Sequence, residues 1–311
     1  METAHCPICG SAEFIPFMEV PDRFDSTGEK RWKLVRSVES GLIMLNPRPE
    51  ASGMEAFYPS GLYDPHLAGG TEKNGFRFSL AARRMLLGYR AGIVLKYHEK
   101  PLRELSILEV GCSTGDLLGF LNRKKGIPLD RIAGIETNNA AAQCARNRFG
   151  LEIHPAVPRN EWKGRKFDRI VLWHTLEHIH AAGEMLDMLF GMLRQDGLMV
   201  IALPNPASTD AAIYGENWIA WDAPRHLYHF TPGTTATLLE KHNLNIFTSM
   251  PYFPDTLYNL AYSEKLACRG KKKPFDPLRL SRAVLKTVAA LPGYCNDPSP
   301  ASGIVYFARG A

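Results

Sequence analysis

Residues 107–116 read Ile-Leu-Glu-Val-Gly-Cys-Ser-Thr-Gly-Asp, and this stretch decides the fold. A short apolar strand runs into a glycine turn, and the apolar run Leu117–Leu121 predicts a helix directly after the turn. Glycine at positions 111 and 115 lets the backbone turn sharply without a Cβ in the way, so a ligand can lie on the main chain at the helix N-terminus. A second predicted strand, Arg131–Ile135, ends at Glu136, whose carboxylate is well placed to accept both ribose hydroxyls of a nucleoside.

The order of these features is more specific than the glycines alone, which match neither a dinucleotide fingerprint nor a phosphate loop. Strand, Glu109, glycine turn, helix and Glu136 together resemble motif I of the class I S-adenosylmethionine (SAM) methyltransferases. In that family the turn holds the methionine part of the cofactor, and the acid after the second strand holds the ribose. Ser113 stands where the family usually has a middle glycine. The alternative is an αβ turn that binds no nucleotide. The resemblance implies SAM as cofactor and a cofactor site made of Glu109, Gly111, Cys112, Ser113, Gly115, Asp116, Glu136, Thr137 and His174.

Length and composition fit a single enzyme rather than a nucleic-acid-binding or membrane protein. The 311 residues suffice for a large core, and the net charge of +5 is mild. Because the basic residues are scattered and the run Lys271–Lys273 is short, we expect no nucleic-acid partner. The chain shows no long apolar span or signal peptide, and its six cysteines are mostly dispersed, so we expect a cytoplasmic protein.

The N-terminal segment, residues 1–50, is similar to a zinc ribbon that has lost half of its ligands. Cys6-Pro-Ile-Cys9-Gly10 reads as one metal-binding turn, but the second turn reads Ser37-Val-Glu-Ser40-Gly41. The string Asn46-Pro-Arg-Pro49 and the pair Phe57-Tyr58 follow this turn. Together they resemble the sequence of a bacterial group of methyltransferases with an N-terminal ribbon. Since serine hydroxyls are poor ligands for zinc, we expect strands over 14–20, 32–38 and 42–45 without metal. The alternative is a weak zinc site of both thiolates and His5.

The rest of the chain alternates between predicted strands and helices. An amphipathic helix is expected over 72–99, within a helical cap at 51–105. Within 106–311 we expect helices over 139–149 and 182–193 and strands over 151–155, 167–172, 198–203, 245–250 and 303–308. This alternation predicts an α/β fold with a Rossmann-like, seven-stranded, mostly parallel sheet and helices on both faces. The final two strands are expected to be antiparallel, as in the resembled family.

The fourth core strand ends in Trp173-His-Thr-Leu-Glu-His178, which places polar side chains at the sheet edge where ligands bind. The string fits the H-x-x-E-H pattern of a zinc peptidase, but that pattern requires a helix in a peptidase scaffold. It also resembles the Leu-Glu-His string of class I methyltransferases, some of which hold a metal there. We favour a structural role for Glu177 and His178 and predict no metal site. The alternative is half a site made of His174, Glu177 and His178.

The segment 217–231 is too polar for a core segment and too rich in rings for a plain loop. A similar Pro-Arg-His string closes over the acceptor in the resembled group. The predicted catalytic residues are His226, His174 and Asp222, and the predicted acceptor-binding residues are Trp218, Trp221, Arg225 and His229. A histidine that titrates near neutrality suits removal of a hydroxyl proton, and Asp222 would orient it. The alternatives are a structural loop tied down by Arg225 and His226, and transfer by alignment without a base.

The acceptor itself is the least determined feature. The resembled groups favour a small-molecule or glycan-type acceptor, such as a sugar or lipid-linked hydroxyl. The alternatives are a quinone or phenolic O-methyltransferase and a catalytically silent SAM-binding protein. Residues 251–302 are expected to form a helical insert, with an amphipathic helix around 278–291 whose basic residues allow a weak contact with a membrane surface. Oligomeric state is not predicted.

Overall fold

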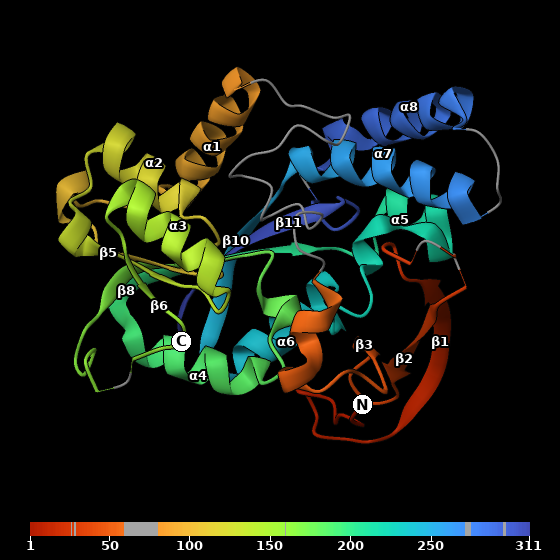
Figure 1. The fold of residues 1–311 in the computed structure, drawn as a ribbon, viewed down its shortest axis with the longest axis horizontal. Coiled ribbons are helices and arrows are strands. Elements are labelled where there is room, and N and C mark those ends of the chain that lie inside the picture. The colour runs from red at the N-terminus through yellow and green to blue at the C-terminus, as the bar shows by residue number, and fades with distance from the viewer. Residues whose placement is uncertain (26, 28, 59–79, 159, 271–274, 295–296) are drawn as a thin grey trace.

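The computed structural model describes residues 1–25, 27, 29–58, 80–158, 160–270, 275–294 and 297–311, and its framework is a seven-stranded sheet (Figure 1). In spatial order the strands are β10 (Leu244–Pro251), β11 (Gly303–Gly310), β8 (Leu193–Pro204), β7 (Phe167–Trp173), β4 (Ile107–Val110), β5 (Ile132–Ile135) and β6 (Glu152–His154). The four pairings from β8 to β6 are parallel, and β11 runs antiparallel to both β8 and β10. The predicted fold class and the antiparallel final pair are therefore confirmed.

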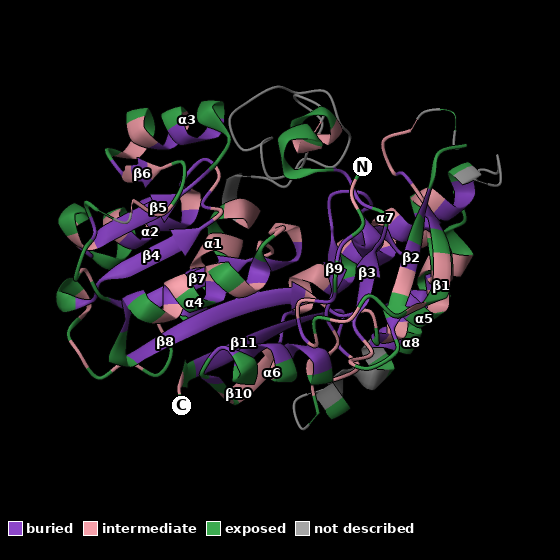
Figure 2. Cartoon of the chain, turned by 90° about the horizontal axis from the view of Figure 1, so that it is seen from below, coloured by how far each residue is buried: buried purple, intermediate pink, exposed green. Residues whose placement is uncertain are grey.

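Helices cover both faces of this sheet, which is why its central strands are mostly apolar and do not alternate between apolar and polar residues. Every residue of β4 and β7 is buried (Figure 2). Neighbouring residues of β4 point to opposite faces, so Ile107 and Leu108 belong to different core clusters. One face carries α1 (Leu80–Val94), α2 (Asp116–Lys125) and α3 (Asn139–Phe149), and the other carries α4 (Ala182–Met192) and α6 (Pro232–Lys241) (Figure 1).

The predicted elements agree with the observed ones in kind more than in length. The helix expected over 72–99 is α1, which ends at Val94, and residues 72–79 lie outside the described residues. The insert holds two helices, α7 (Phe253–Gly270) and α8 (Pro277–Tyr294), of which only the second was predicted. Among the described helices, none combines the length and apolar character needed to cross a membrane.

A second, four-stranded sheet joins the N-terminal segment to a distant part of the chain. Its order is β1 (Phe14–Pro21), β2 (Arg31–Ser37), β3 (Ile43–Leu45) and β9 (Tyr228–His229), all antiparallel. The three predicted ribbon strands are present. Strand β9 belongs to the segment 217–231, so this segment is built into the N-terminal sheet. The domain boundaries expected at residues 50 and 105 stay a prediction.

The N-terminal sheet carries two similar tight turns. Gly10 and Gly41 both have positive φ, at 78° and 73°, a conformation that glycine adopts without strain. The Gly10 N–H donates to the Cys6 carbonyl at 2.8 Å, and the Gly41 N–H donates to the Ser37 carbonyl at 3.0 Å. The imidazole of His5 contacts the Gly10 carbonyl at 3.1 Å. The serine turn thus keeps the backbone shape of the cysteine turn.

The side chains of the two turns meet in pairs. Cys6 Sγ lies 3.1 Å from Ser40 Oγ, and Cys9 Sγ lies 3.5 Å from Ser37 Oγ. These are hydrogen-bond distances for sulfur, so thiol–hydroxyl pairs join the turns. The two turns therefore face each other through these two pairs.

Candidate active site

The glycine turn between β4 and α2 is closed by neighbours that leave no room for side chains. Gly111 and Gly115 have φ of 74° and 72°. A Cβ on Gly111 would lie 2.5 Å from Thr175 Oγ1, and a Cβ on Gly115 would lie 2.8 Å from Ala145 Cβ. Both positions therefore require glycine. The contact with Thr175 also brings the end of β7 against the turn.

Glu136 holds the turn from the end of β5. Its carboxylate accepts the Ser113 N–H at 2.8 Å through one oxygen and the Asn138 N–H at 2.8 Å through the other. A carboxylate offers about four lone-pair positions, so both oxygens can still accept a hydroxyl. Glu136 is buried but remains beside the turn, as the sequence predicts for a ribose-binding acid.

Glu109 is a buried acid with one unused oxygen. The Arg90 guanidinium donates to Oε1 at 2.6 Å, whereas Oε2 is buried without a hydrogen-bond partner. Burial raises the pKa of Glu109 to about 7, against the opposing effect of Arg90. An unused acceptor next to the turn suits a cofactor with hydrogen-bond donors. Arg90, on α1, was not predicted.

The remaining predicted cofactor residues have different surroundings. Asp116 accepts from Arg83 at 2.7 Å and from Arg148 at 2.8 Å, so its carboxylate is occupied by two cations. The Cys112 thiol is buried, and this burial raises its pKa well above the ordinary value. Thr137 is exposed. The Cys112 N–H donates to the Ile135 carbonyl at 3.1 Å, and its carbonyl accepts from the Gly115 N–H at 2.9 Å.

His174 follows β7 in a left-handed conformation, with φ of 50°. Its Nε2 lies 3.0 Å from Asp255 Oδ2, and its Nδ1 lies 3.6 Å from Glu177 Oε1. Burial alone would lower the pKa of His174, but the two carboxylates raise it to about 10. A histidine that holds its proton at neutral pH is a poor base, so the structure does not favour His174 as the second candidate base.

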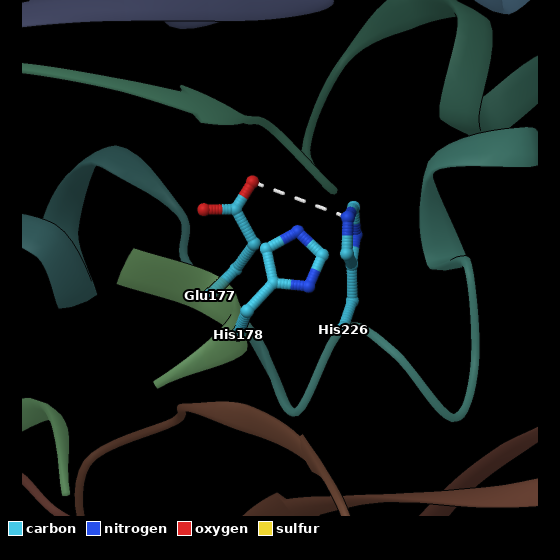
Figure 3. Close-up of side chains that lie close together, drawn as sticks. All are labelled: Glu177, His178 and His226. Atoms are coloured by element: carbon cyan, nitrogen blue, oxygen red, sulfur yellow. Dashed lines mark ion pairs between the residues drawn. The ribbon is translucent and has the colours of Figure 1, made fainter. Parts of the chain in front are cut away.

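Glu177, His178 and His226 form a buried cluster (Figure 3). The first two belong to the single turn η5 (Leu176–His178), and His226 comes from the loop before β9. The Leu227 N–H donates to the Glu177 carbonyl at 2.8 Å, which joins the two segments. Because η5 follows a strand of the sheet rather than lying on a long helix, the peptidase interpretation has no support here.

His226 keeps one ring nitrogen free. Its Nδ1 lies 2.8 Å from the Ala220 carbonyl, to which it must donate, so Nε2 carries the lone pair. That nitrogen lies 4.0 Å from Glu177 Oε1 and 4.0 Å from Asp222 Oδ2. Burial, with a smaller effect from His178, lowers the pKa of His226 well below its ordinary value. The imidazole is therefore neutral with a lone pair on Nε2, although the lowered pKa makes it a weaker base than a free imidazole.

Arg225 and Asp222 are part of a buried ionic network that reaches the N-terminal sheet. Arg225 donates to Asp222 at 2.7 Å, to Asp22 at 3.2 Å and to the Phe57 carbonyl at 3.0 Å. Arg23 lies 2.8 Å from the same Asp222 oxygen. Arg225 is 1% exposed. Arg225 therefore has the structural role of the alternative interpretation. The Asp222 carboxylate lies 4.0 Å from the His226 imidazole, beyond hydrogen-bond distance, although the His226 N–H donates to the Asp222 carbonyl at 3.0 Å.

The two tryptophans expected to contact the acceptor are core residues in this structure. Trp218 is 1% exposed and donates its indole N–H to Asp210 at 2.7 Å, and Trp221 donates to the Gly215 carbonyl at 2.8 Å. His229 is buried, its ring centroid 4.8 Å from that of Trp221, and burial lowers its pKa to about 3. The structure contradicts the expectation that Trp218 and Trp221 pack on a sugar ring. Both rings are buried, and both indole N–H groups already donate to acceptors within the protein.

Two parts of the site escaped the sequence analysis. Asp255 lies in the insert, where no motif marks it, and Arg90 lies on the predicted amphipathic helix, where no motif marks it either. The sequence analysis considered His174 with Glu177 and His178, whereas the structure brings His226 to that pair. No spacing in the sequence indicates this, since His226 lies 48 positions beyond His178.

Comparison with known proteins places these features in a family. Residues 82–249 match the family model described as a methyltransferase domain. A ubiquinone biosynthesis O-methyltransferase of Bradyrhizobium diazoefficiens is 27% identical over 169 residues, which cover 51% of this chain and 66% of that protein. The same-named protein of Rhodopseudomonas palustris is 28% identical over 145 residues, covering 45% and 57%. The chain thus spans less than two thirds of these relatives. An O-methyltransferase from a polyketide synthase of Brevibacillus brevis, solved with S-adenosylhomocysteine, has a TM-score of 0.47 at 15% identity, with 74% of each chain covered.

Proposed function

Because the chain belongs to the methyltransferase-domain family, we propose that it is a SAM-dependent methyltransferase that modifies a hydroxyl of a small-molecule or glycan-type acceptor. The observation that carries this proposal is the contact between the Glu136 carboxylate and the glycine turn. Together they offer a ribose acceptor and a bare backbone at one edge of a parallel sheet, where ligands of such sheets bind.

The residues of the turn fit the cofactor by their own properties. Gly111 and Gly115 present backbone to the methionine part, Glu136 accepts the ribose hydroxyls, and the unused oxygen of Glu109 is available to a donor of the amino acid. When bound, SAM supplies a methyl group on a sulfonium, whose carbon–sulfur bond breaks with the electron pair staying on sulfur. Cys112, Ser113, Asp116, Thr137 and His174 complete the proposed cofactor site.

On the acceptor side, His226 is the proposed base. Its Nε2 takes the hydroxyl proton as the acceptor oxygen bonds to the methyl carbon, and its Nδ1–H stays on the Ala220 carbonyl. Glu177, 4.0 Å away, stabilises the imidazolium that results. His229 and Asp222 are proposed to shape this side of the site without touching the reacting atoms.

A lipid-linked acceptor is supported by the outer face of α8. Leu278 and Leu285 are 71% and 67% exposed, and Arg282 and Lys286 on the same helix are exposed as well. Apolar side chains flanked by cations are typical of helices that lie on anionic membrane surfaces. We propose a weak surface contact that brings the enzyme to such a substrate.

A phenolic or quinol hydroxyl is the second candidate acceptor. It is favoured by the names of the curated relatives. The third possibility is a silent SAM-binding protein.

A methyl-transfer screen with labelled SAM separates these three possibilities. Transfer to sugar or lipid-linked hydroxyls supports the first candidate, and transfer to catechols or quinols supports the second. If SAM binds but none of these acceptors is methylated, hydroxyl methylation is contradicted and the silent alternative is favoured.

We also propose that the N-terminal segment is a ribbon without a tightly bound metal, as in a degenerate member of the resembled group. Two thiols and two hydroxyls are a weak donor set for zinc. We expect elemental analysis of the purified chain to find no zinc held by Cys6 and Cys9. The double variant Ser37→Cys/Ser40→Cys, which restores four thiols on unchanged turns, should retain one zinc ion and melt at a higher temperature. One zinc per wild-type chain that is lost in Cys6→Ser would contradict this proposal.

A further inference from the structure

Glu177 is a buried carboxylate that lacks the partners such a group requires. It is 1% exposed, and neither of its oxygens has a hydrogen-bond partner among the described residues. Its nearest basic atoms are His174 Nδ1 at 3.6 Å and His226 Nε2 at 4.0 Å, both beyond hydrogen-bond reach. Burying a carboxylate without hydrogen bonds is costly, and the protonated His174 nearby does not reach hydrogen-bond distance, so a cation in direct contact with Glu177 would stabilise this position.

Two imidazoles present lone pairs to the same point. His178 Nδ1 lies 2.9 Å from the Arg225 carbonyl, and His226 Nδ1 lies 2.8 Å from the Ala220 carbonyl. Each Nδ1–H must donate to its carbonyl, which leaves both Nε2 atoms unprotonated. A backbone carbonyl that fixes one ring nitrogen while the other faces inward is the usual support of a metal-binding histidine. Figure 3 shows the His178 ring between Glu177 and His226.

We propose that Glu177, His178 and His226 bind a divalent first-row transition metal ion such as Zn²⁺. Their ligand atoms all lie within 4.8 Å of one another. Bonds of about 2.0–2.2 Å would bring the three atoms to roughly 3.3–3.5 Å apart, so small side-chain rotations suffice. Two neutral imidazoles and one carboxylate suit zinc, manganese or iron rather than calcium or magnesium.

The metal site is inferred from the geometry alone, whereas the role of the metal in methyl transfer rests on the proposed function. In the loaded protein His226 is a ligand, not a base. Three protein ligands leave a position at which the acceptor hydroxyl can bind and lose its proton to solvent. In the metal-free protein the same nitrogen remains available as the base. A chelator should lower the rate of methyl transfer if the active protein holds the metal, and should leave the rate unchanged if the metal-free protein is the active one.

Cobalt binding tests the site without cofactor or acceptor. The full chain, freed of metal by a chelator, is titrated with Co²⁺ and followed by its visible absorption. We expect one Co²⁺ per chain, without the near-ultraviolet band that thiolate ligands produce, and a rise in melting temperature. Glu177→Gln and His226→Ala should each weaken Co²⁺ binding by more than about 100-fold. That exceeds the loss of roughly 10- to 100-fold expected when the replaced residue only hydrogen-bonds to a metal ligand. The control His154→Gln, on the edge strand β6, should bind Co²⁺ as the wild type does.

Glu177→Gln keeps the shape of the side chain and removes only its charge, so it should fold and should show no metal-dependent rise in melting temperature. The inference is overturned if the folded wild type binds no Co²⁺, if binding survives Glu177→Gln, or if a thiolate band appears and vanishes in Cys6→Ser. SAM affinity, measured on the same preparation, reports on the proposed function separately, because the glycine turn and Glu136 follow β4 and β5, whereas Glu177 and His178 follow β7.

Discussion

Replacing His226 with alanine is expected to lower kcat by ~10²–10⁴ while leaving SAM affinity unchanged, the usual loss when a positioned base is removed. His226 Nε2 is the free nitrogen of a neutral imidazole, fixed by the Ala220 carbonyl and facing Glu177. It comes from the loop before β9, whereas the glycine turn and Glu136 follow β4 and β5. Single-turnover rates with the acceptor found in the screen, and calorimetry with SAM, measure the two quantities.

A control for this variant is His154→Gln, on the edge strand β6, which should retain the wild-type rate. If His226→Ala loses SAM binding or its fold, the structural alternative for this segment is supported instead. Full activity of His226→Ala with the true acceptor would indicate transfer by alignment without a base, since His174 is held protonated by its two carboxylates.

The variant Arg225→Met is expected to lower the free energy of unfolding by ~3–5 kcal/mol, the cost of removing one partner from a buried ion pair. Arg225 is surrounded by Asp222, Asp22 and the Phe57 carbonyl, and its loss leaves two buried carboxylates short of a donor. The network spans the N-terminal sheet and the segment 217–231, so both should loosen together. Urea denaturation measures the effect.

Arg225→Lys is the matched comparison, because it keeps the positive charge but loses the planar set of guanidinium donors. Its free energy of unfolding should lie between those of the wild type and Arg225→Met. An unchanged unfolding free energy in Arg225→Met, together with a raised KM for the acceptor, would restore the acceptor-binding role that the sequence predicts for this residue.

The seven-stranded sheet was predictable because local pattern and tertiary environment agree there. The run 170–173 is apolar since both faces of β7 are covered, and Gly111 is required by the close approach of Thr175. Glu136 was predictable because a turn and a strand end are both visible in sequence. These features depend on neighbours within a single βαβ unit.

The segment 217–231 was misread for the opposite reason. Its polar and aromatic residues indicated an exposed, acceptor-facing loop, but their partners come from far away in the chain. Asp22 pairs with Arg225, Met44 pairs with Tyr228 in the small sheet, and Asp210 accepts from Trp218. A buried polar network has the same composition as a binding loop, and only its partners distinguish the two. The meeting of Glu177 with His226 was hidden in the same way.

Calorimetric titration of SAM into the wild-type chain and into Glu136→Ala tests the central claim most directly. We expect one site per chain, and an affinity that falls by about 10- to 150-fold in the variant. That loss corresponds to about 1.5–3 kcal/mol, the contribution of a hydrogen bond to a charged group. Glu136→Gln, which retains one acceptor oxygen, should lose less. Absence of SAM binding by the wild type, or equal affinity of wild type and Glu136→Ala, would contradict the assignment of the glycine turn and Glu136 as the cofactor site.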